Sequence, residues 1–202
     1  MLIKVIVMEG RQHFPKYKLF LASKSPRRIQ LMEEAGYSFK VLQNDVKEDY
    51  PIGLPVDEIP VFIAKNKAQG AMKALKDDQS IVIGADSVVI LNNTLIGKPK
   101  DVSDAKHILR KLSGQTHRVV TGVALMSLSK TITFSEMAEV SFSTLADSEI
   151  DYYVEHFNPL DKAGAYGIQD WIGLCRVHTI KGTFSNIMGL PMARLYEELM
   201  RF

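Results

Sequence analysis

The segment Leu21–Arg28, LASKSPRR, decides how the rest of the chain is interpreted. An apolar run leads into it and predicts a strand, and Pro26 then suits the first position of a helix with Ser25 as its N-cap. The free N–H groups and partial positive charge of a helix start favour phosphate. Arg27 and Arg28 add planar donors for phosphate oxygens. The segment therefore indicates an anion site, and an ordinary strand–turn–helix with solvated arginines is the alternative it leaves open.

Two later segments also carry ligand-binding chemistry. The stretch Ile83–Ser87, IGADS, sets the carboxylate of Asp86 where a buried strand is expected to stop, which is where open α/β sheets present ligand-binding groups. The stretch 161–169, DKAGAYGIQ, combines charged and polar side chains with Gly164 and Gly167. Glycine lets a backbone approach a ligand closely, so this stretch is suited to a base edge or a phosphate.

The order of the motifs is more specific than any one of them: SKSPRR, GADS, GKP (97–99), SGQTHRVVTGV (113–123), DKAGAYGIQ and MGLP (188–191). In this order the chain resembles the Maf family, the septum-formation-associated nucleoside triphosphate pyrophosphatases. The resemblance covers residues 18–202 as one catalytic domain and leaves residues 1–17 as an N-terminal extension. DKAGAYGIQ is similar to the branch that acts on dTTP and UTP, whereas the branch for 7-methyl-GTP differs here.

The resemblance implies a fold and an activity. The fold would be the ITPase-like one, with two lobes around a cleft. The activity would be hydrolysis of dTTP and UTP between the α- and β-phosphates, which gives the monophosphate and pyrophosphate, with modified pyrimidine nucleotides as further substrates to be considered.

The resemblance also implies roles for individual residues. Asp86 matches the catalytic aspartate and Glu48 an acidic residue that assists the metal, so both are expected to bind Mg²⁺ or Mn²⁺ through carboxylate oxygens. The residues expected to bind substrate phosphates or to select the base are Ser23, Arg27, Arg28, Lys67, Ser87, Lys98 and Gln169. A solvated loop is the alternative for Glu48. Lys98 is preferred to Lys67, because a lysine on a helix more often faces solvent.

Base selectivity is expected at Arg27, Ser87 and Gln169. The amide of Gln169 offers a donor and an acceptor for the O4/N3–H edge of uracil or thymine. Many relatives have threonine where this chain has Ser87, so we expect the selectivity class to be kept but loosened. A structural hydrogen bond is expected for His117, and packing for Trp171.

Composition is that of an ordinary globular protein: 202 residues, 46% hydrophobic and 24% charged, with a net charge of +2. The near-neutral charge argues against nucleic acid as a partner. No stretch approaches the roughly 20 apolar residues that span a bilayer, and the N-terminal apolar run is too short for a signal peptide, so a cytoplasmic protein without a membrane partner is expected. Cys175, the single cysteine, is expected in the core.

Catalytic motifs of other classes are missing from the sequence. Without GxxxxGK[ST] the chain is not a P-loop ATPase, and without HExxH or a cysteine cluster a zinc site is disfavoured. Three alternatives remain: a pyrophosphatase for modified purine nucleotides such as ITP or 7-methyl-GTP, a non-catalytic regulator of septation, and a DNA-binding protein. The oligomeric state is open, a homodimer included.

Periodicity and turn residues predict an α/β fold with a mixed sheet, a long bent hairpin and flanking helices. Strands are expected up to Ala22 and at 39–42, 81–85, 88–91, 94–96, 117–128, 131–145 and 175–180. Helices are expected at 26–36, from between 56 and 60 to about 76, from a cap at Ser103 to before Gly114, from a cap at Asp147 to about 156, and at 190–201. For Leu2–Met8 a strand, a flexible arm and a misassigned start are the alternatives.

Overall fold

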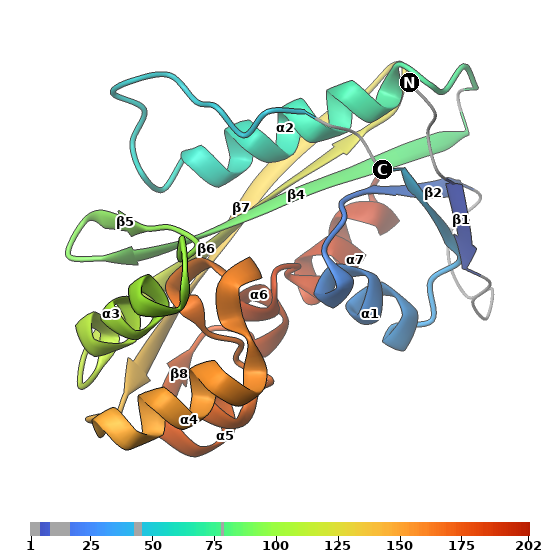
Figure 1. The fold of residues 1–202 in the computed structure, drawn as a ribbon. Coiled ribbons are helices and arrows are strands. Elements are labelled where there is room, and N and C mark those ends of the chain that lie inside the picture. The colour runs from blue at the N-terminus through green and yellow to red at the C-terminus, as the bar shows by residue number, and fades with distance from the viewer. Residues whose placement is uncertain (1–4, 9–16, 43–45, 78) are drawn as a thin grey trace. The chain divides into compact units, whose positions relative to one another are not determined.

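A computed structural model describes residues 5–8, 17–42, 46–77 and 79–202. It is a mixed α/β fold with the sheet order β1-β3-β2-β4-β6-β7-β8, and β5 pairs with β4 outside this path (Figure 1). The strands are β1 Val5–Met8, β2 Lys18–Ala22, β3 Phe39–Leu42, β4 Ser80–Leu91, β5 Thr94–Ile96, β6 Thr116–Met126, β7 Thr131–Phe142 and β8 Val177–Lys181. The helices are α1 Pro26–Glu34, α2 Ile59–Met72, α3 Val102–Leu112, α4 Asp147–Phe157, α5 Trp171–Arg176, α6 Phe184–Met188 and α7 Met192–Met200, with short 3₁₀ turns at Pro159–Asp161 and Ala163–Ala165.

The chain divides into two compact units. Unit 1 comprises residues 1–86, 121–136 and 189–202, and unit 2 comprises residues 87–120 and 137–188. In unit 1, β2 pairs in parallel with β3 and β4, and β1 pairs antiparallel with β3. In unit 2, β8 pairs antiparallel with β7. Because the division falls within β4, β6 and β7, each of these strands contributes to both units.

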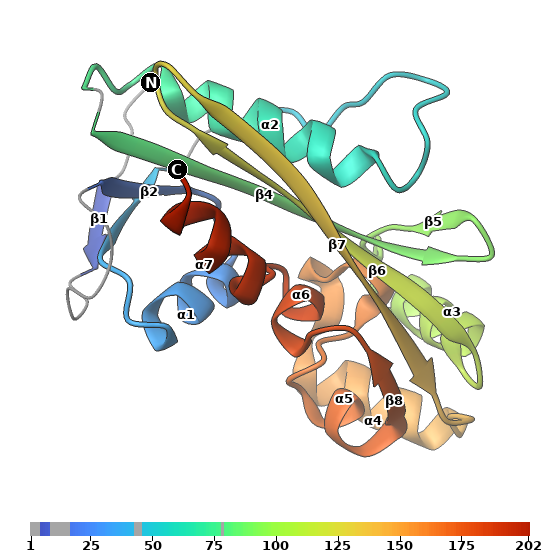
Figure 2. The same cartoon turned by 180° about the vertical axis from the view of Figure 1, so that it is seen from behind.

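The core of unit 1 forms between the sheet and α2. Alanines at 64, 68 and 71 line one face of α2 and pack with Phe20 and Val82 from the strands. Both views show α1 and α7 on the side of β4 away from α2 (Figure 1, Figure 2). Burial of these apolar side chains is the main source of the unit's stability.

Two glycines bring α2 unusually close to the sheet. A Cβ at Gly84 would clash with the carbonyl oxygen of Ala64 and lie 2.9 Å from the Ala68 nitrogen. A Cβ at Gly122 would clash with the backbone of Pro60 and Val61. Only glycine allows this approach, so the two residues fix the height of α2 above β4 and β6.

Unit 2 is organised around a buried aromatic group. The rings of His117, Phe142 and Tyr166 pack edge to face with centroids 4.9–5.3 Å apart. His117 Nε2 lies 2.7 Å from the Tyr166 hydroxyl, which confirms the structural hydrogen bond expected for this histidine. Burial lowers the pKa of His117 to about 4 and raises that of Tyr166.

The expected strand end before Asp86 is wrong. β4 runs without a break from Ser80 to Leu91, so Asp86 lies in the middle of a strand. The predicted hairpin is confirmed with Asn92 and Asn93 at positive φ, but its first strand is the continuation of β4. Beyond Asp86 the strand stays extended because its backbone pairs antiparallel with β5 through Val89–Leu91.

Several helix boundaries also differ from prediction. The cap of α3 is Asp101, whose carboxylate accepts from the Asp104 N–H, and not Ser103. Asp147 is the first residue of α4, and the Glu149 carboxylate accepts from the N–H of Ala146. α2 ends at Met72, four residues early, because tight i→i+3 turns follow it.

The C-terminal part of the chain shows a further difference. The predicted strand at 175–180 begins only at Val177, because residues 171–176 form α5. Cys175 lies on this helix and is exposed, so its predicted place in the core is wrong.

The extension before residue 18 is described only in part. Val5–Met8 forms β1, which is the strand alternative for this segment. Residues 1–4 and 9–16 lie outside the described residues. Within the described ranges, no helix has the length and apolar character needed to cross a membrane.

Candidate active site

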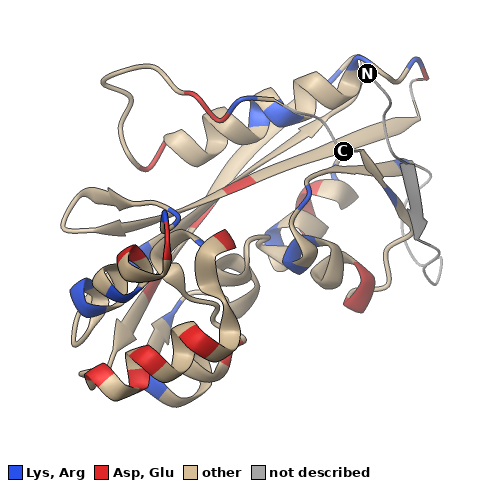
Figure 3. Cartoon of the chain, in the orientation of Figure 1, with Lys and Arg blue, Asp and Glu red and all other residues tan. Residues whose placement is uncertain are grey.

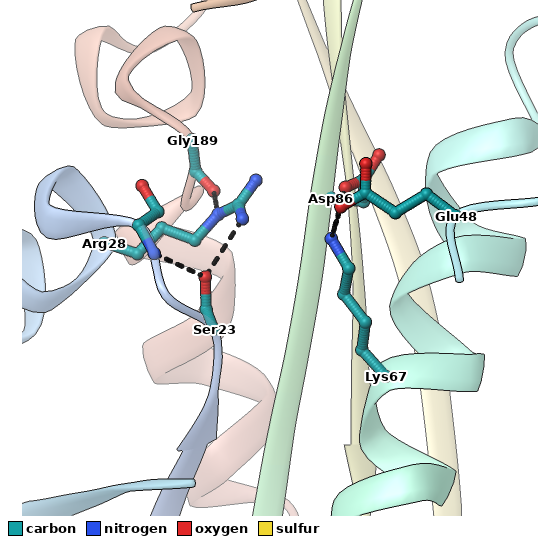
Figure 4. Close-up of polar contacts among 7 residues, drawn as sticks. Ser23, Arg28, Glu48, Lys67, Asp86 and Gly189 are labelled. Carbon is teal, nitrogen blue, oxygen red and sulfur yellow. Dashed lines mark hydrogen bonds and ion pairs between the residues drawn. The ribbon is translucent and has the colours of Figure 1, made fainter. Parts of the chain in front are cut away.

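A buried carboxylate on β4 is joined by a lysine to a second carboxylate. Lys67 of α2 lies with its Nζ 2.7 Å from Asp86 Oδ1 and 2.6 Å from Glu48 Oε1 (Figure 4). Asp86 and Lys67 are largely buried, whereas half of the Glu48 side chain is exposed. A charge removed from water needs a partner, and here each buried charge has one.

The close packing at Gly84 explains why these groups meet. Side chains alternate along a strand, so Gly84 and Asp86 face the same side of β4. That side is covered by α2, whose residues 64 and 68 contact Gly84. Lys67 is on the same helix, and the Asp86 carboxylate therefore comes within reach of its ammonium group.

Arg28 forms the second half of the site in unit 1. Its Nε donates to the carbonyl oxygen of Gly189 at 2.6 Å, and its Nη1 donates to Ser23 Oγ at 3.2 Å (Figure 4). Ser23 Oγ also accepts from the Ser25 N–H at 3.2 Å. Burial lowers the pKa of Arg28, and the nearby negative charge of Asp86 opposes this effect. The alternative of a solvated arginine is therefore wrong for Arg28.

The charge order of α1 favours an anion at its start. The helix has Pro26 at its first position, as predicted, but the Ser25 side chain makes no capping hydrogen bond. Figure 3 shows that the helix begins with basic residues and ends with acidic ones. This order is the reverse of the one that stabilises a helix dipole, so the arginines add to the positive potential at the helix start.

Of the remaining predicted residues, Arg27 is half-buried on α1 in unit 1, and the other three lie in unit 2. Ser87 is half-buried on β4, and Lys98 is exposed in the segment after β5. Gln169 is half-buried after the second 3₁₀ turn, and its Nε2 donates to Asp170 Oδ1 at 3.1 Å. The structure thus groups Ser23 with Arg28, and Glu48 with Lys67 and Asp86. The reason given for preferring Lys98 to Lys67 does not hold, since Lys67 does not face solvent but lies largely buried against Asp86; which of the two lysines contacts phosphate stays a prediction.

Two residues of these networks were missed by the sequence analysis. Gly189 supplies the carbonyl that holds Arg28, and the MGLP motif was its only signal. Asp170 accepts from both Gln169 and Tyr153, and no sequence pattern set it apart from an ordinary helix cap.

The donor set for a divalent metal is small but suitable. Within the ranges that the structure describes, no group of three or more His, Cys, Asp or Glu side chains gathers around one point. The carboxylates of Glu48 and Asp86 already converge on one cation, the Lys67 ammonium. Mg²⁺ is commonly bound by one or two carboxylates together with substrate phosphates, so the two residues fit such an ion.

A basic helix start in the same unit as a buried, paired carboxylate is an arrangement that favours phosphate groups and is typical of phosphate-binding α/β proteins. Comparison with known proteins makes this more specific. The chain belongs to the Maf family, since the family model described as Maf-like protein matches residues 18–202.

Curated relatives match over 85–98% of their own length. A dTTP/UTP pyrophosphatase of Porphyromonas gingivalis is 45% identical over 189 residues, which is 93% of this chain and 95% of the relative. One of Phocaeicola vulgatus is 45% identical over 192 residues, 94% of this chain and 98% of the relative. One of Cytophaga hutchinsonii is 43% identical over 187 residues, 93% of this chain and 85% of the relative.

Proposed function

We propose that this protein hydrolyses dTTP and UTP between the α- and β-phosphates and releases the nucleoside monophosphate and pyrophosphate. The observation that carries the proposal is the agreement of relatives bearing this activity in their names, over more than nine-tenths of the chain. The paired carboxylates and the buried arginine of unit 1 supply the charges that such a reaction needs.

Asp86 is the residue to which we assign the proton transfer. Its Oδ1 accepts a hydrogen bond from Lys67 in the structure, and in the reaction the carboxylate takes the proton of the attacking water. The water oxygen bonds to the α-phosphorus, and the bond from that phosphorus to the bridging oxygen breaks. Pyrophosphate leaves with the electron pair of that bond.

The basic groups bind the phosphates in this proposal. Arg28 is held by Gly189 and Ser23, so its guanidinium is fixed in orientation before substrate arrives. A preorganised donor stabilises developing negative charge without reorganising during the reaction. Ser23 acts through Arg28, and Arg27 and Lys98 supply further positive charge.

Glu48 and Asp86 are the residues that would hold Mg²⁺ or Mn²⁺. Such an ion supplies neutralisation of phosphate charge when bound. The Lys67 ammonium and the metal ion are both positive and would occupy the same place between the two carboxylates. Lys67 would therefore release the carboxylates and contact phosphate instead.

Base selection is assigned to Ser87 and Gln169 in unit 2. Both offer hydrogen-bonding groups, and Gln169 can meet the donor and acceptor of an imide edge. The resemblance adds Arg27 to this set.

The test is a nucleotide panel with product analysis. The purified protein with Mg²⁺ or Mn²⁺ should convert UTP and dTTP to monophosphate and pyrophosphate. The products are identified by ³¹P NMR. Release of orthophosphate with a diphosphate product contradicts the cleavage position. A strong preference for ITP or 7-methyl-GTP contradicts the pyrimidine assignment. Glu48→Gln should lower activity, and Asp49→Asn, an exposed neighbour, serves as the matched control.

A further inference from the structure

The carboxylate of Asp170 in unit 2 lies at the centre of a hydrogen-bond network. Its Oδ2 accepts from the Tyr153 hydroxyl at 2.7 Å, and its Oδ1 accepts from Gln169 Nε2 at 3.1 Å. The Tyr153 oxygen in turn accepts from the Gly167 N–H at 3.0 Å. Lys162 Nζ lies 3.7 Å from Oδ2. Since Tyr153 is fully buried, the Asp170 carboxylate is anchored on a rigid side chain.

This contact determines which way the Gln169 amide faces. An ionised carboxylate only accepts hydrogen bonds, so the amide nitrogen and not the oxygen must be directed toward Asp170. Gly167 leaves room for this arrangement, since a Cβ there would lie 2.8 Å from Gln169 Nε2. The amide is therefore held in one of its two orientations.

The other end of the amide is left unsatisfied. Gln169 Oε1 is shielded from water and has no hydrogen-bond partner among the described residues. A buried acceptor without a partner is costly, and in a native protein it needs an explanation. A ligand N–H that reaches this oxygen as covering side chains move aside would remove the cost.

The orientation of the amide has a direct consequence for base choice. Uracil and thymine present a donor at N3–H beside an acceptor at O4, whereas cytosine presents an acceptor at N3 beside a donor at its amino group. A flipped amide exchanges its own donor and acceptor, and so exchanges which of these edges it complements.

We propose that Asp170 is a positioning residue that locks the Gln169 amide with Oε1 toward the N3–H of uracil or thymine and so rejects cytosine. The inference rests on the proposed function, because it requires Gln169 to read a pyrimidine base. It adds a residue that never touches the base itself and acts only through the orientation of its neighbour.

The experiment compares kcat/KM for UTP and CTP in the wild type and in Asp170→Asn. Asparagine keeps the size of the side chain, but its amide can donate to Gln169 Oε1 and stabilise the flipped orientation. The UTP/CTP ratio should fall by about tenfold or more, with most of the change in KM. Asp161→Asn is the matched control, since it removes a nearby carboxylate that also pairs with Lys162. Its ratio should equal that of the wild type.

Two further measurements separate positioning from a general structural effect. In a Gln169→Ala background, Asp170→Asn should leave the ratio unchanged. Tyr153→Phe, which removes one anchor of the carboxylate, should lower the ratio in the same direction but less, and it replaces Asp170→Asn if that variant does not fold. A ratio that stays at the wild-type value in the folded Asp170 or Tyr153 variant overturns the inference.

A nucleotide-free measurement distinguishes this inference from the proposed function. The side-chain amide signals of Gln169 in ¹⁵N-edited NMR spectra should shift in Asp170→Asn relative to the wild type. A wild type that hydrolyses UTP and CTP equally overturns the inference but leaves the pyrophosphatase activity standing. A wild type that hydrolyses no pyrimidine nucleotide overturns the proposed function and the base-reading role, and the NMR shift then reports only on the hydrogen bond.

Discussion

The ammonium group of Lys67 lies 2.7 Å from Oδ1 of Asp86, and the same nitrogen lies 2.6 Å from Oε1 of Glu48. One cation thus holds together two carboxylates from different parts of unit 1. The arrangement keeps the negative charges close before any metal or substrate arrives, and it makes each of the three side chains sensitive to loss of the others.

Asp86→Asn should abolish most turnover while the protein remains folded. The change keeps the size of the side chain but removes its charge, and with it the ability to take a proton. General base catalysis is typically worth about 10²–10⁴ in rate. Steady-state kinetics with UTP measures the loss, and circular dichroism checks the fold. Turnover near the wild-type value in a folded Asp86→Asn protein would refute the assigned role.

Lys67→Met should strengthen binding of a divalent cation in the absence of nucleotide. Removing the ammonium leaves Glu48 and Asp86 without their shared counter-ion. The affinity for Mn²⁺ should rise by about tenfold, because the metal ion no longer meets the repulsion of a positive charge beside the two carboxylates. Turnover of UTP should fall at the same time. Calorimetric titration with Mn²⁺ is the measurement, and Lys65→Met on the same helix is the control. An unchanged affinity would show that the lysine does not compete for the cation position.

Arg28→Lys should weaken substrate binding and lower stability. Lysine cannot reproduce the planar set of donors that reaches the Gly189 carbonyl and Ser23 together. Leaving a buried acceptor without its donor costs about 1–3 kcal/mol, which urea unfolding can measure. Arg110→Lys, whose partner Asp147 is exposed, should change stability much less. Equal effects of the two changes would count against a fixed, buried role for Arg28.

Gln169→Glu should change base selectivity and leave the hydrolytic groups intact. The substitution removes the amide donor and sets a second negative charge beside Asp170. A loss of discrimination of about 1–3 kcal/mol is typical for one unpaired polar contact. Relative rates across UTP, dTTP, CTP and GTP provide the measurement. If the relative rates stay the same, Gln169 does not read the base.

Protonation of His117 should make the protein less stable in acid. Burial lowers its pKa in the folded state to about 4, whereas an unfolded histidine titrates near 6.5. Between these values the unfolded state binds more protons, so stability is constant above about pH 6.5 and falls as pH drops toward 4, by about 3 kcal/mol in total. Urea unfolding from pH 4.5 to 7.5 tests this. The free energy of unfolding should depend less steeply on pH in His117→Gln than in the wild type. An identical pH dependence would assign the effect to other groups.

Much of the fold followed from local sequence signals, and the reasons are visible in particular elements. Apolar runs predicted β2 and β3, and Gly36, which has a positive φ, predicted the end of α1 to within two residues of Glu34. These are features decided within a few residues. Asp86 was singled out on the resemblance and on the wrong expectation that its strand ends there, and its catalytic role stays a prediction.

What could not be predicted depends on contacts between distant segments. β4 continues through Asp86 between its neighbours β2 and β6, which come from other parts of the chain, and the Asp86 carboxylate finds its partner in Lys67 of α2. Asp101 rather than Ser103 caps α3 because its carboxylate reaches the Asp104 N–H, a choice between two good caps that spacing alone does not make. Cys175 is exposed because an apolar-looking stretch formed a short surface helix.

The close contact of α2 with the sheet affects how mutational surveys of this protein would be interpreted. Gly84 and Gly122 touch no substrate in the proposed reaction, yet any side chain at either position would push α2 away and carry Lys67 with it. A survey that scores activity alone would rank both glycines beside Asp86. A parallel score for the amount of folded protein would separate the residues that perform chemistry from those that set the distance at which it occurs.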